Sequence, residues 1–230
     1  MIKNILWDVD GTLLNFKESE KYALSKCLDE VNIPYDDDTI SLYSKINLSF
    51  WKRLEKGEIS RHEVIFGRFE YFFKLLGRSI DIDRFQKNYQ TALAGIFFYY
   101  DDSLNLCRLL KEKGLRQYIV TNGIASTQHK KLKDSCLDEL MDKIFISDEI
   151  GTPKPNKNFF DAVFENIPNF SKEETLIVGD SLTSDMRGGN NSGILCCWYN
   201  PFGEINSEKD LRIDYEIKHL WELLKILNLE

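Results

Sequence analysis

The chain has 230 residues, of which 43% are hydrophobic, and its 30 basic and 37 acidic residues give a formal net charge of −7. This length can bury a substantial core as one large domain or two small ones, and the net negative charge gives no electrostatic footprint for binding a nucleic-acid polymer. No apolar run is long enough to span a bilayer, the first residues lack a secretory signal, and the scattered cysteines form no disulfide or zinc pattern. We therefore expect a cytoplasmic monomer or weak homo-oligomer whose partners include neither a nucleic-acid polymer nor a membrane.

The first predicted strand, residues 2–7, leads directly into two acidic residues. Asp8 and Asp10 follow an apolar run, and Gly11 comes next. This pattern is typical of a buried strand that carries carboxylates to its C-terminal end, where α/β sheets bind their ligands. Two carboxylates this close repel each other unless a cation lies between them or one of them is protonated. A simple turn at the end of the strand is the alternative, because Asp and Gly are common turn residues.

The sequence pattern of residues 16–99 predicts helices and no convincing strand. A helix over 16–31 is followed by a break at Pro34, and helical spacing then continues as far as Gly95. One segment carries an apolar stripe at helical intervals, which we interpret as a packing surface: Ile65, Phe66, Phe69, Phe72, Phe73 and Leu76. We therefore expect residues 16–99 to form an inserted all-helical domain.

Strands and helices are predicted to alternate over residues 100–230. The expected strands are 116–121, 143–147, 175–180, 194–199 and 215–217, and the expected helices are 102–113, one ending near 136, 158–165 and a closing helix to 229. Such alternation implies crossover connections and a parallel sheet with helices on both faces. We predict an α/β fold with a Rossmann-like doubly wound sheet, formed by residues 1–15 and 100–230.

Polar side chains of different chemical kinds follow four of the predicted strands, in chain order: Asp8 with Asp10, Thr121 with Asn122, Lys154, and Asp180 with Asp185. A parallel sheet can bring these strand ends together at one edge. The acids suit a hard cation such as Mg²⁺, and the hydroxyl, amide and ammonium groups supply donors and positive charge for phosphate oxygens. The combination indicates a phosphorylated substrate.

Four motifs in this order resemble those of the haloacid dehalogenase (HAD) superfamily of phosphohydrolases. They are D-V-D-G-T from Asp8, T-N-G from Thr121, P-K-P-N around Lys154 and G-D-S-x-x-x-D from Gly179 to Asp185. The resemblance spans nearly the whole chain. It implies an HAD-like catalytic core, with the helical insertion between the first two motifs as its cap domain.

The resemblance also implies the chemistry of two aspartates. Asp8 would be the nucleophile that attacks phosphorus and forms an aspartyl-phosphate. Asp10 would protonate the leaving oxygen and then activate the water that cleaves the intermediate. The dehalogenases of the superfamily lack an acid at this second position, so Asp10 favours a phosphatase. A phosphomutase stays open, because it uses the same pair of acids.

The other motif residues would bind the metal and the phosphate. The resemblance implies that Mg²⁺ is held by the Asp8 carboxylate, the Asp10 backbone carbonyl and Asp180. Asp185 would support these ligands or join them, or it would simply cap the helix that follows. The groups implied to hold the transferring phosphate are Lys154, Thr121 and Asn122.

A narrower resemblance, to a bacterial pyrimidine 5′-nucleotidase group, concerns the substrate. It rests on N-L-S-F-W at 47–51, K-G-E-I at 56–59, R-F at 68–69, I-S-D-E-I-G at 146–151 and G-G-N-N-S-G at 188–193. It implies a nucleoside monophosphate as substrate, sorted by a cap that closes over the site. Asn47 and Trp51 would then contact its sugar or base, with packing inside the cap as the alternative for Trp51.

Two further functions stay open at this point. A phosphatase for a small sugar phosphate or phosphoglycolate would ignore the base of a nucleotide. A phospho-ligand sensor would keep the fold without turnover, but the intact set of Asp8, Asp10, Lys154 and Asp180 argues against a pure binding protein. The sequence therefore predicts a magnesium-dependent phosphomonoester hydrolase that acts on nucleoside monophosphates, with pyrimidine nucleotides favoured.

Overall fold

The computed structural model describes residues 1–229, and these residues form two compact units. One unit combines residues 1–15 with the residues from 99 onward, and the other is the continuous segment Phe16–Phe98. The second unit is therefore an insertion that follows the first strand of the first unit. No helix in the described part of the chain is both long and apolar enough to cross a membrane.

The first unit is built on a six-stranded parallel sheet. In chain order its strands are β1 (Asn4–Trp7), β2 (Arg116–Thr121), β3 (Lys143–Ile146), β4 (Thr175–Gly179), β5 (Leu195–Tyr199) and β6 (Tyr215–Ile217). Their spatial order is β3-β2-β1-β4-β5-β6, and every neighbouring pair is parallel. The order reverses between β1 and β4, which is the topological switch point where such sheets bind ligands. The predicted doubly wound parallel sheet is confirmed.

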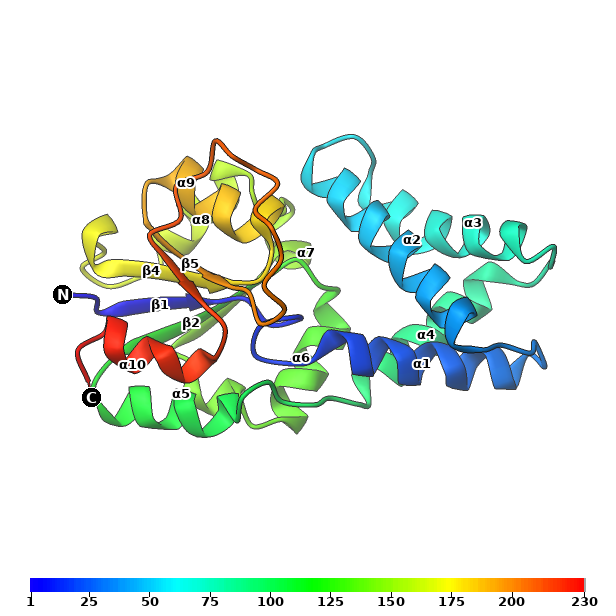
Figure 1. Cartoon of the computed structure of the whole chain (residues 1–230), viewed down its shortest axis with the longest axis horizontal. Helices are drawn as coiled ribbons and strands as arrows, with labels where there is room; N and C mark the ends of the chain where they lie inside the picture. The colour runs from blue at the N-terminus through cyan, green and yellow to red at the C-terminus, as the bar shows by residue number, and fades with distance from the viewer. Residues whose placement is uncertain (230) are drawn as a thin grey trace. The chain divides into compact units, whose positions relative to one another are not determined.

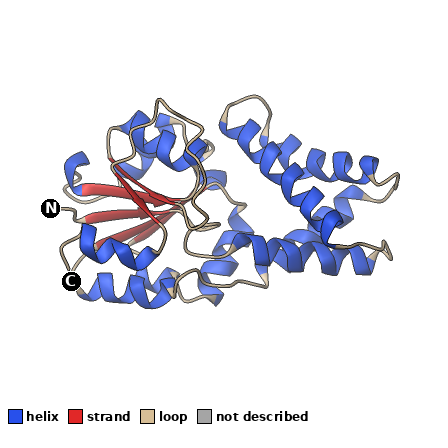
Figure 2. Cartoon of the chain, in the orientation of Figure 1, coloured by secondary structure: helices blue, strands red, loops and turns tan. Residues whose placement is uncertain are grey.

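Helices cover both faces of this sheet (Figure 1), and Figure 2 shows the strands enclosed between them. Helices α8 and α9 lie on one face, and α5 and α10 lie on the other (Figure 1). The helices are α5 (Ser103–Glu112), α6 (Ala125–Asp134), α7 (Ser147–Ile150), α8 (Lys157–Phe164), α9 (Arg187–Ser192) and α10 (Leu223–Ile226). Short 3₁₀ turns occur at Asp138–Leu140, Lys172–Glu174 and Leu220–Glu222, and a π-helical turn occurs at Leu182–Met186.

The core beneath α8 holds the central strands in place. Side chains alternate along a strand, and the strand register therefore puts Leu6, Tyr118 and Ile177 on the same face of the sheet. They pack in one buried cluster with Phe159 and Phe160 of α8. Burying a large apolar side chain contributes about 1.5–3 kcal/mol. This packing fixes the position of the strand ends that carry the predicted site residues.

The predicted strands 116–121 and 215–217 match β2 and β6 at both ends. The closing helix differs, because the sequence predicts that it reaches residue 229 and α10 ends at Ile226. Asn228 adopts a left-handed conformation with φ of 56°. Its N–H donates to the Lys225 carbonyl at 3.1 Å, and the next N–H donates to the Leu224 carbonyl at 2.8 Å. A left-handed residue that caps the last carbonyls in this way ends a helix.

The second unit consists of α1 (Phe16–Glu30), α2 (Asp37–Glu55), α3 (Arg68–Leu75) and α4 (Ile82–Ala94), with a π-helical turn, Glu63–Gly67, before α3. Its core is aromatic, and Tyr43 of α2 stacks on Phe69 with ring centroids 5.3 Å apart. From the predicted apolar stripe, Phe69, Phe72 and Phe73 are buried in this core. Ile65 and Phe66 are only half-buried, because the wider π-helical turn rotates the residues before α3 out of phase with it.

Candidate active site

Three carboxylates meet at the C-terminal edge of the sheet. Asp8 follows β1, Asp180 follows β4, and Asp185 lies in the π-helical turn after β4; one oxygen from each lies within 4.8 Å of the others. Residues so distant in sequence meet because β1 and β4 are neighbours, with Trp7 opposite Val178. Asp8 and Asp185 are buried, whereas Asp180 is exposed. The cluster is therefore open on the side of Asp180.

The Lys154 ammonium group lies inside this acidic cluster and is 1% exposed. It donates to Asp8 Oδ1 at 2.9 Å, to Asp185 Oδ1 at 2.6 Å and to the Val120 carbonyl at 2.7 Å. These three acceptors match the three N–H groups of an ammonium. Burial by itself lowers the pKa of Lys154, but the charges of Asp185 and Asp8 raise it above its ordinary value. Lys154 therefore carries a permanent positive charge within the cluster.

The pKa of Asp8 is raised to about 7, chiefly by burial; the charge of Lys154 opposes the shift, and the charge of Asp185 adds to it. The cause is the low polarity around a carboxylate that has lost most of its water. A carboxylate in such a place is ionised more readily when a second cation approaches it. The electrostatics of Asp8 therefore favour a bound metal ion or another positive group.

Thr12 links the two strand ends directly. Its buried hydroxyl donates to Asp8 Oδ2 at 3.1 Å and accepts from the Asp180 backbone N–H at 3.1 Å. With Lys154 on Oδ1 and Thr12 on Oδ2, the Asp8 carboxylate is held in one orientation. Sequence reasoning missed this role, although Thr12 is the last residue of the D-V-D-G-T motif.

Two glycines make room for the acids. A Cβ atom at Gly11 would lie 2.4 Å from Asp180 Oδ2, and Gly11 also has φ of +104°, which L side chains rarely adopt. A Cβ atom at Gly179 would lie 2.3 Å from the Asp185 carboxylate. The glycines beside the motif acids are therefore needed for close approach of backbone and carboxylate.

The T-N-G motif after β2 positions Lys154. The Asn122 side-chain oxygen accepts from the Lys154 backbone N–H at 2.8 Å, and its amide nitrogen donates to the Lys154 carbonyl at 3.0 Å. Thr121, which is 2% exposed, accepts from the Gly123 N–H at 3.1 Å through its hydroxyl. The predicted phosphate contacts of Thr121 and Asn122 remain predictions, and the observed contacts fix the loop that carries the lysine.

The carboxylate of Asp10 is held by two side chains of α6. Its Oδ1 accepts from Lys131 Nζ at 2.6 Å, and its Oδ2 accepts from Gln128 Nε2 at 2.5 Å. The sequence predicts Asp10 itself as a site residue but not these two partners. The signal was weak, because Lys131 lies in a lysine-rich helix where a solvated surface is the ordinary expectation.

The two residues predicted to contact the substrate lie in the helical unit. Asn47 is 2% exposed; its amide nitrogen donates to Glu20 Oε1 at 2.6 Å, and its oxygen accepts from Arg68 Nη1 at 2.8 Å. Trp51 is half-buried and packs against a small cluster that includes Leu54. Both side chains therefore have structural contacts within the helical unit, and their contact with substrate remains a prediction.

The residues at the sheet edge fit a divalent metal ion. Asp8, Asp180 and Asp185 form the acidic cluster, Lys154 pairs with Asp8 and Asp185, and the nearby Asp10 pairs with Lys131. Their formal charges leave an excess of two negative charges, which one divalent cation would balance. Clustered carboxylate oxygens with an open side are also the donors that Mg²⁺ prefers, because it keeps water or substrate oxygens among its ligands.

A doubly wound sheet with acids and a buried lysine at its switch point is typical of an α/β enzyme. The chain belongs to the haloacid dehalogenase-like hydrolases, whose family profile matches residues 5–199. The superfamily predicted from the four motifs is thereby confirmed.

The relatives of the chain include nucleotidases. It is 39% identical to the HAD-hydrolase YfnB of Bacillus subtilis, over 99% of this chain and 96% of that protein. A crystal structure of YfnB bound to magnesium has a TM-score of 0.92 and covers 99% of both chains. The chain is 34% identical to the pyrimidine 5′-nucleotidase PynA of Streptococcus pneumoniae, over 98% and 95% of the two proteins. It is 28% identical to the pyrimidine 5′-nucleotidase YjjG of Escherichia coli, over 97% and 96%.

The acidic cluster leads us to expect that Mg²⁺ stabilises the folded protein. Millimolar Mg²⁺ should raise the melting temperature by several degrees, because the ion binds only the folded cluster. Asp180→Asn should lose most of this shift, whereas Asp161→Asn, which alters an exposed acid on α8, should retain it. Thermal unfolding with and without EDTA measures both effects. An equal shift in the two variants would contradict a site at Asp180.

Binding of Mg²⁺ should also strengthen as the pH rises. Because the pKa of Asp8 is raised to about 7 without metal, most Asp8 carboxyls at pH 6 carry a proton that the ion must displace. The apparent affinity should therefore rise by up to about tenfold per pH unit below pH 7 and level off above pH 8. Calorimetric titration at pH 6, 7 and 8 tests this, and an affinity that is constant over this range would contradict it.

Proposed function

We propose that this protein is a magnesium-dependent phosphomonoester hydrolase that works through an aspartyl-phosphate on Asp8. The observation that carries the proposal is the Asp8 carboxylate, which is buried and held by Lys154 and Thr12 beside an acidic cluster with an open side. A carboxylate fixed on both oxygens next to a permanent cation suits attack on a phosphoryl group, because the negative charge of the phosphate is compensated where the bond forms.

The reaction has two steps. In the first, an Asp8 oxygen attacks phosphorus in line, the bond from phosphorus to the ester oxygen breaks, and Asp10 gives that oxygen a proton. In the second, Asp10 takes a proton from water, which attacks phosphorus, releases inorganic phosphate and restores Asp8. Lys154 compensates charge on the transferring phosphoryl group. Magnesium would be held by Asp8, Asp180 and the Asp10 backbone carbonyl, and it would supply further positive charge to that group.

The proposed substrates are pyrimidine nucleoside monophosphates. Support comes from PynA and YjjG, two relatives that are named pyrimidine 5′-nucleotidases and that match the chain over nearly its whole length. The helical unit Phe16–Phe98 would act as the cap that selects the leaving group and excludes water from the intermediate.

A substrate panel tests the proposed activity. With Mg²⁺ we expect phosphate release to be fastest from uridine, cytidine and thymidine monophosphates, at least about tenfold faster in kcat/KM than from purine nucleotides, because a pocket can discriminate leaving groups by 1–3 kcal/mol. Sugar phosphates and phosphoglycolate complete the panel, and EDTA should abolish release. Faster release from the sugar phosphates would reject the nucleotidase assignment, and isomerised product without free phosphate would indicate a mutase.

Asp8→Asn should reduce kcat by at least about 10³-fold, because the amide keeps the shape of the side chain but is no nucleophile. Near-UV circular dichroism should stay close to that of the wild type. Asp161→Asn is the matched control, since it makes the same chemical change at an exposed position, and its kcat should be unchanged. Residual activity of Asp8→Asn above a few per cent of the wild type would reject Asp8 as the nucleophile.

A further inference from the structure

Helix α6 turns a polar face toward the protein interior. Thr127, Gln128, Lys131 and Leu132 are all buried, and three of these four side chains are polar. Lys131 is the most unusual, because its side chain is 0% exposed and lysines are almost never fully buried without a partner. Its carboxylate partner is Asp10, at 2.6 Å. A buried ammonium costs several kcal/mol in lost hydration unless it is paired in good geometry, so this pair constrains both side chains.

Gln128 holds the other oxygen of the same carboxylate. Its Nε2 donates to Asp10 Oδ2 at 2.5 Å, while its Oε1 has no hydrogen-bond partner among the described residues. A Cβ atom at position 123 would lie 2.1 Å from that Nε2, so Gly123 of the T-N-G motif leaves the space through which Gln128 reaches Asp10. The amide gives up one of its own hydrogen bonds in this position, which indicates that its contact with Asp10 determines where it lies.

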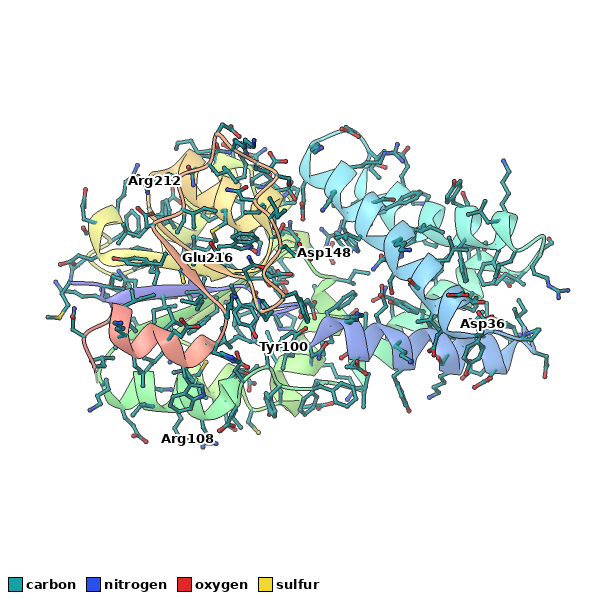
Figure 3. The ribbon with its side chains drawn as sticks, viewed as in Figure 1. Asp36, Tyr100, Arg108, Asp148, Arg212 and Glu216 are labelled. Atoms are coloured by element: carbon teal, nitrogen blue, oxygen red, sulfur yellow. The ribbon has the colours of Figure 1, made fainter. Side chains whose placement is uncertain are left out.

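Helix α6 is itself fixed to the neighbouring helix. The Ala125 backbone N–H, at the first residue of α6, donates to Asp148 Oδ2 of α7 at 3.0 Å, and Asp148 is labelled in Figure 3. His129 of α6 lies 2.7 Å from Glu149 of α7, measured from Nε2 to Oε1. The two groups that hold Asp10 therefore come from a helix that is anchored at its N-terminal end.

We propose that Lys131 and Gln128 are positioning residues, which hold the Asp10 carboxyl group in the orientation from which it exchanges a proton with the leaving-group oxygen. This inference rests on the proposed function. Two donors on two different oxygens fix the plane of the carboxyl group, and the Asp10 side chain keeps 23% of its surface exposed for a reacting group. Without these donors the side chain would rotate freely and proton transfer would lose its geometry.

The test compares two kinds of leaving group. The constant kcat/KM covers only the steps up to departure of the leaving group, and an alkoxide needs a proton at that step, whereas p-nitrophenolate leaves without one. For Lys131→Met we expect kcat/KM on the best alkyl phosphate substrate to fall by about 10- to 100-fold. On p-nitrophenyl phosphate it should fall less than about threefold. Gln128→Leu should show the same selectivity with a smaller loss.

Two variants serve as controls. Lys130→Met makes the same change at the adjacent residue, whose side chain is 53% exposed, and should leave both substrates unaffected. Lys131→Arg keeps a cationic donor and should restore most of the selective loss, which a purely structural role would not predict. Circular dichroism checks the fold of each variant, and Gln128→Leu carries the test if Lys131→Met does not fold.

The outcomes separate this inference from the proposed function. Equal losses on the two substrates, or no loss on either, would overturn the positioning role while leaving the phosphatase in place. A wild-type protein that releases no phosphate from any ester would instead overturn the proposed function, and the positioning role would fall with it.

Discussion

The site depends on one buried ammonium group. Lys154 donates to Asp8, to Asp185 and to the Val120 carbonyl, and these acceptors come from the ends of β1, the turn after β4 and β2. Leaving such a charge without partners would cost several kcal/mol. Lys154 therefore needs these three acceptors, and its charge in turn offsets the repulsion between Asp8 and Asp185. Burial and the nearby charge of Asp185 nevertheless leave Asp8 with a raised pKa, which Lys154 only partly offsets. A bound cation would lower the electrostatic cost of holding these carboxylates together.

Much of this arrangement could be predicted from the sequence, because strand periodicity and parallel topology are both readable. An apolar run that ends in acids predicts a strand with its carboxylates at the ligand edge, and alternation with helices predicts that the strands are parallel. Together they put Asp8, Lys154 and Asp180 at one edge without any knowledge of distances. The four ordered motifs added the family, which the match over residues 5–199 shows independently.

The remainder could not be predicted, for two physical reasons. Thr12 and Asn122 were visible in the motifs, but which atoms their side chains would contact depends on loop conformation, and no periodicity encodes that. The contacts of Gln128 and Lys131 with Asp10 were not predicted, because polar residues on a short lysine-rich helix indicate a solvated face. In the helical unit, the π-helical turn Glu63–Gly67 shifts the helical phase of the residues before α3 relative to those within it. Ordinary helical spacing in the sequence does not predict such a turn.

Asp8 and Asp10 show how the fold offsets the charge repulsion between two acids that lie close together in the sequence. Carboxylates two residues apart repel each other unless positive charge separates them, and the protein supplies a different lysine to each. Asp8 faces Lys154 and the acidic cluster with Asp180 and Asp185, whereas Asp10 faces Lys131 on α6. Their separate partners allow neighbouring groups of one chemical type to have different environments. The roles proposed for Asp8 and Asp10 need that difference, because a nucleophile must be unprotonated when it attacks phosphorus, whereas a proton carrier gives and takes a proton.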